Sequence, residues 1–142
     1  MRFLLFISFL LLISCTVKKA IEPKEETVSN DIQFVHETSM MDVLAIAEKA
    51  KKPVFVDFYA SWCAPCREMD QTVFRDPTID KIINENYIPF KVDGETDSGA
   101  NIKAILEVQS YPTYLIVDSK GVVLKRFLGK GTKSDIQNFL GK

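Results

Sequence analysis

Two cysteines, Cys63 and Cys66, follow directly after a strongly apolar run at residues 53–60. The run hardly alternates between apolar and polar residues, which is typical of a strand covered by helices on both faces. Pro65 lies between the cysteines and predicts the first turn of a helix, because proline has no N–H to lose and its φ already suits a helix start. A buried strand that leads at once into a helix predicts an α/β fold.

The spacing of Cys63 and Cys66 also predicts chemistry. Residues at i and i+3 share one face of a helix, so the two thiols can close a disulfide. The free N–H groups and the dipole of a helix start stabilise a thiolate, which is the reactive form of cysteine. We therefore expect a redox-active pair in which Cys63 is the nucleophile and Cys66 is the buried, resolving thiol.

Two other interpretations of the cysteine pair are a zinc site and a purely structural crosslink. A closed zinc site needs further Cys or His ligands, and the chain offers His36 and Cys15, of which Cys15 has another explanation below. A disulfide between consecutive turns of one helix stabilises a fold little. The pattern therefore favours redox chemistry without a metal, and His36, which lies outside the motif, is expected at the surface.

Asp57 lies in the middle of the apolar run, between Val56 and Phe58. In a strand that is covered on both faces its carboxyl is buried. Burial disfavours the charged form and raises the pKa of a carboxyl. The sequence therefore predicts a buried acid of raised pKa six residues before Cys63.

The remaining sequence predicts short strands that alternate with amphipathic helices. Ser39 and Thr132 precede segments with apolar residues at helical spacing, and both are good helix caps. Ile102, Ile105 and Leu106 are expected to share the buried face of one helix. The predicted strands are 32–35, 54–59, 87–92, 113–118 and 122–127. The predicted helices are one after Ser39 with a buried stripe within 40–47, then 63–74, 77–84 and 98–108, and a last one after Thr132 that buries residues within 136–140. This order predicts one mixed sheet between layers of helices.

The first residues of the chain form a separate segment. Arg2 is followed by an apolar stretch that ends at Ile13. The stretch is too short to span a bilayer and is typical of a secretory signal. We expect residues 1–14 to be the signal peptide.

Cys15 follows the small residue Ser14 at the end of that stretch, which resembles a bacterial lipoprotein cleavage site. We expect Cys15 to be lipid-modified, residues 15–31 to be a flexible tether without apolar periodicity, and residues 32–142 to be the folded domain. An ordinary signal peptide with an unrelated cysteine and an uncleaved anchor are the alternatives.

Composition restricts the classes of partner. The 142-residue chain has a formal net charge of −1 and no basic stripe, so nucleic-acid binding is not expected. Hydrophobic residues make up 46% and charged residues 26%, which allows an ordinary core without a disulfide scaffold.

The stretch from about Asp31 to the C-terminus resembles a thioredoxin-fold domain, and residues 56–66 carry most of the likeness. Residues 72–77 make it most similar to the thioredoxin-like domains of bacterial envelope proteins, such as the C-terminal domain of the inner-membrane reductase that passes electrons to the periplasm. The resemblance implies a thioredoxin fold, with a central mixed β-sheet flanked by helices on both faces.

The resemblance also implies roles for residues near the cysteines. Asp57 matches the buried acid of the family, which acts as a general base on the resolving thiol, Cys66. Lys91 either corresponds to the lysine that partners this acid or faces solvent, and both interpretations stay open. Ala64 stands where thioredoxin usually has glycine.

Further residues are assigned to the site by the same resemblance. Tyr111 and Pro112 match the second motif of the family, in which a cis proline faces the disulfide and the residue before it binds an extended substrate. Trp62 is expected to offer partners an apolar surface, with a core aromatic as the alternative. Gly129 matches a glycine beside the site, with a plain turn glycine as the alternative.

The function that the resemblance implies is thiol–disulfide oxidoreduction. The reduced pair would reduce disulfides of envelope proteins without a metal or organic cofactor, and an upstream membrane thiol reductase would recharge it. The implied location is the bacterial cell envelope, where the protein is a lipid-anchored monomer that faces the periplasm or the cell exterior. A disulfide oxidase and a non-catalytic peptide-binding module are the alternatives, and Ala64 and Tyr111 leave electron direction and partner preference open.

Overall fold

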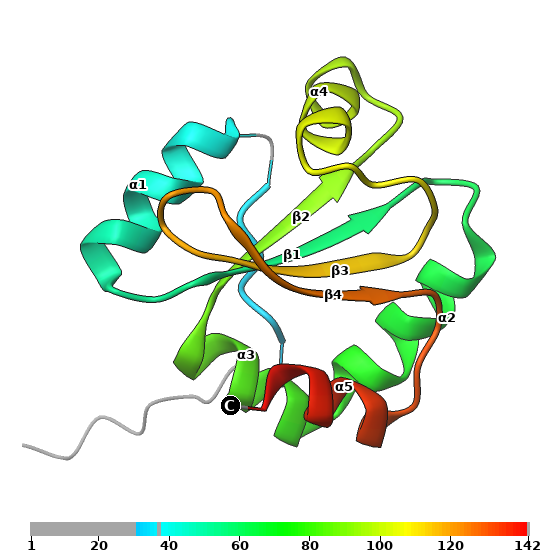
Figure 1. The fold of residues 1–142 in the computed structure, drawn as a ribbon. Coiled ribbons are helices and arrows are strands. Elements are labelled where there is room, and N and C mark those ends of the chain that lie inside the picture. Colours follow the sequence, from blue (N-terminus) through cyan, green and yellow to red (C-terminus); the bar gives the residue numbers. More distant parts are fainter. Residues whose placement is uncertain (1–30, 37, 142) are drawn as a thin grey trace, which may run out of the picture.

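The apolar run forms β1 (Val54–Tyr59), a central strand of the four-stranded sheet in the computed structural model (Figure 1). β2 (Ile88–Asp93) runs parallel to β1 on one side, and β3 (Thr113–Val117) runs antiparallel on the other. β4 (Val123–Leu128) pairs antiparallel with β3, so the strand order is β2-β1-β3-β4. The predicted mixed sheet and its terminal hairpin are confirmed.

The structure describes residues 31–36 and 38–141. The predicted signal peptide, the tether as far as residue 30 and the lipid-modified Cys15 lie outside the described residues. Within the two described ranges, no helix has both the length and the apolar character needed to cross a membrane.

Helices cover both faces of the sheet (Figure 1). Two of them, α1 and α4, pack on one face, and α2, α3 and α5 pack on the other. A short 3-10 helix, η1, joins α2 to α3. The bounds are α1 (Met40–Ala50), α2 (Ala64–Gln71), η1 (Val73–Arg75), α3 (Pro77–Asn86), α4 (Asp97–Ile105) and α5 (Lys133–Leu140).

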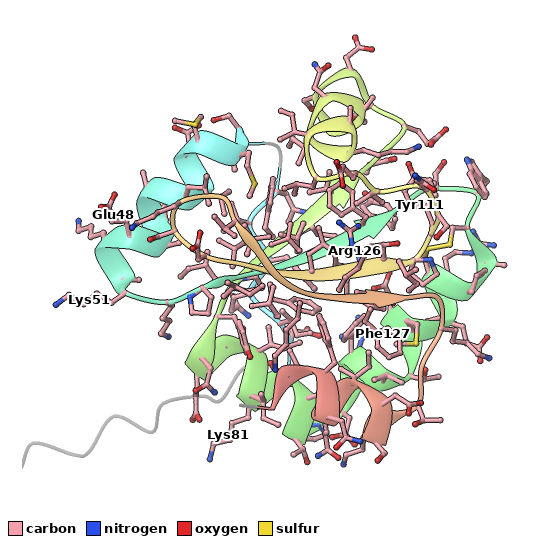
Figure 2. The ribbon with its side chains drawn as sticks, in the orientation of Figure 1. Glu48, Lys51, Lys81, Tyr111, Arg126 and Phe127 are labelled. Carbon is pink, nitrogen blue, oxygen red and sulfur yellow. A yellow bond between two sulfur atoms is a disulfide. The ribbon has the colours of Figure 1, made fainter. Side chains whose placement is uncertain are left out.

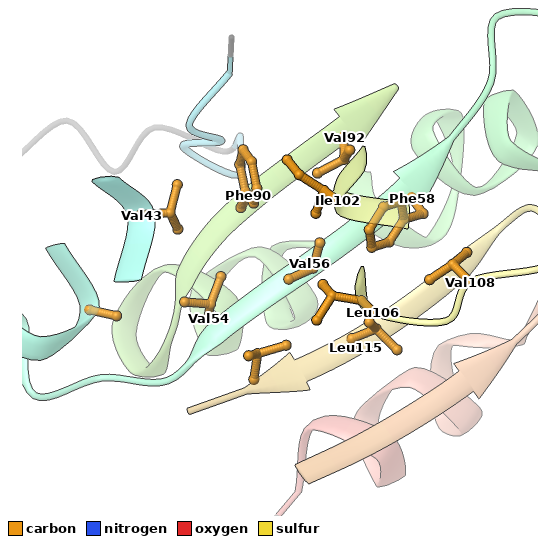
Figure 3. Close-up of a cluster of buried hydrophobic side chains, with 12 residues drawn as sticks. Val43, Val54, Val56, Phe58, Phe90, Val92, Ile102, Leu106, Val108 and Leu115 are labelled. Carbon is orange, nitrogen blue, oxygen red and sulfur yellow. The ribbon is translucent and has the colours of Figure 1, made fainter. Parts of the chain in front are cut away.

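Alternate residues of β1 point to opposite faces of the sheet. Val54, Val56 and Phe58 belong to the core under α1 and α4, which Figure 3 shows. Phe55 belongs to the core under α2, α3 and α5. All of these side chains are fully buried, so the nearly continuous apolar sequence of the strand follows from burial on both faces.

Side-chain caps determine where several helices begin. The Ser39 side chain accepts a backbone hydrogen bond at the start of α1. Thr132 and Asp135 form a capping box at the start of α5. Asp76 caps α3, in which Pro77 takes the first position. The sequence predicted all of these helix starts.

The predicted strand at residues 32–35 is wrong. The Phe34 N–H donates to the Ile32 carbonyl at 2.9 Å, so the backbone turns locally there instead of extending. Val35 makes an isolated bridge to Phe90 of β2. The segment lies against the sheet without becoming one of its strands.

The helix expected at residues 63–74 is shorter than predicted. α2 ends at Gln71, and Thr72 leaves the helical region with φ −121° and ψ −80°. The Thr72 hydroxyl donates to the Glu68 carbonyl at 2.7 Å. Such bonding of a threonine to the preceding turn competes with continued helix, and the chain passes into η1.

Ile105 does not lie on the buried face of α4, contrary to the prediction. Gly99, Ile102 and Leu106 are buried, whereas Ile105 is 75% exposed. At about 100° per residue, Ile105 projects roughly a quarter turn away from the centre of the face that the buried residues share.

Candidate active site

Cys63 and Cys66 are joined by a disulfide at the start of α2. Cys63 is the N-cap residue, and its sulfur accepts a hydrogen bond from the Cys66 N–H at 3.2 Å. Pro65 lies in the first turn. The unpaired N–H groups and the dipole of α2 therefore act directly on the Cys63 sulfur, which is the sulfur they would stabilise as a thiolate.

Both cysteines are buried, with exposures of 2% for Cys63 and 4% for Cys66. Cys66 is buried as predicted, but Cys63 is buried as well, so exposure does not distinguish the two. Tyr59 and Tyr111 pack against the cluster that contains the disulfide. Figure 2 shows Tyr111 beside the disulfide, at the end of the sheet where α2 begins.

Asp57 is buried and forms an ion pair with Lys91, whose Nζ lies 2.7 Å from its Oδ2. Lys91 also pairs with Asp70 of α2 at 2.5 Å. We call Asp57, Lys91 and Asp70 the buried charge network. Of the two interpretations of Lys91, the solvent-facing one does not hold.

Aromatic rings complete the surroundings of Lys91. Its Nζ lies 5.1 Å from the ring centroids of both Phe34 and Tyr59. A cation over the face of a ring is attracted by the negative charge density of that face. The residues at 32–35 therefore help to enclose the network although they form no strand.

Burial raises the pKa of Asp57 above its ordinary value, although the charge and hydrogen bond of Lys91 oppose this effect. For Lys91, burial alone would lower the pKa, but the carboxylates of Asp57 and Asp70 together raise it. Lys91 thus stays charged at neutral pH, and Asp57 holds a proton more readily than an exposed aspartate does. Such a carboxyl is suited to accept a proton from a thiol.

Asp70 was not predicted from the sequence. It lies on α2 at the i+4 position from Cys66, and residues at this spacing share one face of a helix. That spacing was the available signal for Asp70. The register of β1 and β2, which places Asp57 opposite Lys91, was the missing information.

The Tyr111–Pro112 peptide bond is cis. The Pro112 carbonyl accepts a hydrogen bond from the Gly129 N–H at 2.8 Å. Gly129 has φ +80°, a conformation that L side chains rarely adopt, and no other atom would crowd a Cβ there. Gly129 therefore lies next to Pro112 and serves as a turn glycine at the same time.

Trp62 and Tyr111 form an aromatic pair beside the disulfide, with ring centroids 5.8 Å apart in an edge-to-face arrangement. Trp62 is 66% exposed, so the alternative of a core aromatic does not hold. The Tyr111 hydroxyl donates to Glu95 Oε1 at 2.8 Å, and Lys103 Nζ lies 4.8 Å from the Tyr111 ring centroid. Burial raises the pKa of Tyr111, so it remains a hydrogen-bond donor at neutral pH.

Gly94 gives the Tyr111 side chain its space. A Cβ at position 94 would lie 2.1 Å from the Tyr111 hydroxyl oxygen. Gly94, Glu95 and Lys103 were not identified from the sequence, because their contacts with Tyr111 arise only in the folded chain.

His36 is exposed, as expected. In the part of the chain that the structure describes, no three His, Cys, Asp or Glu side chains gather as metal ligands do.

Comparison with known proteins adds to this geometry. The model of a family described as thioredoxin-like matches residues 37–119. The thiol:disulfide interchange protein DsbD of Vibrio vulnificus is 27% identical over 105 residues, which cover 70% of this chain and 18% of that protein. The chain thus spans less than a fifth of the length of this relative.

Two solved structures are similar as well. The solution structure of a putative disulphide-isomerase from Bacteroides thetaiotaomicron matches with a TM-score of 0.68 and 30% identity, over 76% of this chain and 88% of that one. The oxidised C-terminal domain of DsbD from Neisseria meningitidis matches with a TM-score of 0.56 and 27% identity, over 70% of this chain and 86% of that one.

Proposed function

Because this chain belongs to the thioredoxin-like family, we propose that it is a thiol–disulfide oxidoreductase that acts through Cys63 and Cys66. The observation that carries the proposal is the disulfide between these residues at the N-terminus of α2. A helix start activates a thiolate, and a second thiol one turn further on can resolve the product. The buried carboxyl of Asp57, which Lys91 links to Asp70 of that helix, supplies a proton acceptor.

The reaction begins with the reduced pair. The Cys63 thiolate attacks one sulfur of a partner disulfide, a new bond joins Cys63 to the partner, and the other partner sulfur leaves as a thiolate. Cys66 then gives its proton to Asp57 and attacks the Cys63 sulfur. This step forms the Cys63–Cys66 disulfide, releases the second partner sulfur and completes the transfer of two electrons to the partner. The proton on Asp57 passes to one partner thiolate, and the other partner thiolate takes a proton from water.

We infer that Trp62, Tyr111, Pro112 and Gly129 form the surface that receives the partner. Trp62 supplies exposed apolar area, and the hydrogen bond from Gly129 to Pro112 joins two loops next to the disulfide. The partners are disulfide-bearing proteins, and an upstream membrane thiol reductase recharges the oxidised pair. The interchange activity named for the DsbD relative supports exchange with disulfide-bearing proteins.

The proposed location is the bacterial cell envelope, with the domain facing the periplasm or the cell exterior as a lipid-anchored monomer. The pattern of residues 1–15 supports a signal peptide and lipid modification of Cys15. Mass spectrometry of membrane-extracted protein should show a diacylglyceryl adduct on Cys15, and Cys15→Ala should release or misprocess the protein. A soluble mature form that starts elsewhere contradicts the anchor.

The test of the function uses the purified full chain in detergent. With dithiothreitol as the electron source, the chain should accelerate the reduction of insulin. Cys66→Ser should accumulate mixed disulfides with partners, because the resolving thiol is lost, whereas Cys63→Ser should accumulate none. Absence of turnover in the wild type would favour a peptide-binding module, and an equilibrium with glutathione that lies far toward the dithiol would favour an oxidase.

A further inference from the structure

The Cys63–Cys66 disulfide is enclosed, although exchange requires a thiolate to reach a sulfur atom. Tyr111 contributes to this enclosure, since it packs against the cluster formed by Ala60, Cys63 and Cys66. Trp62 is largely exposed, and its ring and that of Tyr111 meet edge to face. Tyr59, at the end of β1, packs against the same cluster, so an incoming thiol has to pass side chains of which Tyr111 is one.

Three neighbours hold Tyr111 in this position. Glu95 accepts the hydrogen bond of its hydroxyl at 2.8 Å. Lys103 lies 4.8 Å from the centroid of its ring and 3.6 Å from Glu95 Oε1. Gly94 leaves room for the hydroxyl, because a Cβ at this position would collide with it.

We propose that Tyr111 is a shield over the disulfide, held closed by Gly94, Glu95 and Lys103, and that this shield selects protein partners over small thiols. The inference rests on the oxidoreductase function proposed above. In it Tyr111 is a specificity-determining residue, and Gly94, Glu95 and Lys103 are positioning residues that act through Tyr111.

A protein partner can offset the cost of displacing Tyr111 where a small thiol cannot. Trp62 and Leu128 are both exposed apolar side chains, and Leu128 lies opposite Thr113, the residue after Pro112. Leu128 also lines a groove of about 920 Å³, together with Lys103, Ser110 and Arg126. A polypeptide segment gains contacts along this surface while it breaks the bond between Tyr111 and Glu95. Dithiothreitol is too small to make those contacts.

The experiment measures how fast the oxidised full chain, in detergent, is reduced by dithiothreitol and by reduced ribonuclease A. One dithiothreitol thiolate attacks the disulfide and its second thiol closes the ring, so the protein gains the two electrons that the reagent loses. The fluorescence of Trp62, the sole tryptophan, reports the reaction in a stopped-flow instrument. The variants are Tyr111→Phe, Glu95→Ala and the combination of both.

Each single variant should be reduced by dithiothreitol about two- to tenfold faster than the wild type, which is the range expected for one lost hydrogen bond. The double variant should react no faster than the faster single variant, because both changes break the same contact. The ratio of the rate with ribonuclease to the rate with dithiothreitol should fall in all three variants. A merely structural role for Tyr111 would leave this ratio unchanged.

Glu68→Ala is the matched control. Glu68 is an exposed carboxylate on α2 that pairs with Lys130, so its removal changes the charge near the site by the same amount without contacting Tyr111. Its rates should equal those of the wild type. If dithiothreitol reduces Tyr111→Phe and Glu95→Ala at the wild-type rate while the wild type still reduces insulin, the shield is overturned and the proposed function stands. Loss of insulin reduction in the wild type overturns the proposed function itself.

Discussion

The disulfide lies between two groups of side chains that differ in charge and in contact with water. The buried charge network links β1, β2 and α2 through Asp57, Lys91 and Asp70, and water has little access to Asp57 and Lys91. The pair of Trp62 and Tyr111 is aromatic and partly open to solvent, with charged residues only at its rim. Poor screening lets the first group shift pKa values, whereas the second acts through shape and contact area.

The largest expected effect is on proton transfer, at Asp57. Asp57→Asn keeps the shape of the side chain and removes the proton acceptor, so release of the mixed disulfide should slow by about 10²–10⁴-fold. Single-turnover kinetics between pH 6 and pH 9 measure this step. An unchanged release rate over that range would mean that Asp57 has only a structural role.

The same variant tests the sign of the pH dependence of stability. The folded state raises the pKa of Asp57 above its ordinary value of about 3.8. The contribution of the Asp57 carboxyl to folding stability is therefore fully present below about pH 3.8, and it is lost as the pH rises through the folded pKa. Asp57→Asn removes this loss, and Lys91 keeps Asp70 as a partner. Urea unfolding between pH 4 and pH 8 should show the variant gaining stability relative to the wild type as pH rises.

Lys91→Met should destabilise the fold by about 3–5 kcal/mol at pH 8, because it leaves Asp57 buried without its cation. The loss should be smaller at pH 5, where Asp57 takes up a proton more readily. Urea unfolding at both pH values measures the difference. Lys81→Met, which removes an exposed cation paired with Glu85, is the control and should change stability by less than about 0.5 kcal/mol. An equal loss at both pH values would point to lost packing instead of an unpaired charge.

Trp62→Ala tests the aromatic pair of Trp62 and Tyr111. It should lower kcat/KM for insulin reduction about tenfold, in line with the loss of an aromatic anchor at an interface. Stability should hardly change, because the side chain is mostly exposed. Ile105→Ala removes an equally exposed apolar side chain from α4 and should leave both quantities unchanged. A comparable loss of activity in Ile105→Ala would show that general surface hydrophobicity is responsible.

The smallest effect is expected at Tyr114, which faces the core under α2, α3 and α5. Its hydroxyl is buried, and no partner lies within hydrogen-bond distance among the described residues. Its ring stacks on Phe55, with centroids 6.0 Å apart. Tyr114→Phe keeps this stacking and removes the unsatisfied group, so the free energy of unfolding should rise by about 1 kcal/mol. A decrease would indicate that the hydroxyl binds an internal water.

Features set by neighbouring residues could be predicted from the sequence. The apolar run predicts β1 and the burial of Asp57, because the apolar side chains on both sides of Asp57 are buried away from water. Ser39 and Thr132 mark helix starts through bonds to residues a few positions away. The cysteine pair and Pro65 place the start of α2 in the same way.

Features that depend on which surfaces meet could not be predicted in this way. The pairing of Lys91 with Asp70 requires the register of two strands and the rotation of α2 above them. The bond from Tyr111 to Glu95 joins two loops whose proximity no local pattern reveals. The apolar residues at 32–35 fit a strand, but the local bond from Phe34 to Ile32 prevents one.

The contact between Gly94 and Tyr111 means that the residue at one of these positions limits which residues the other position tolerates. Glycine is favoured at position 94 while the tyrosine keeps this position, because a Cβ would lie 2.1 Å from the hydroxyl oxygen. A smaller residue at position 111 removes that collision, and only then is position 94 free to drift. Among diverging descendants of this sequence, substitutions should therefore accumulate in a fixed order, with position 111 changing first and position 94 following.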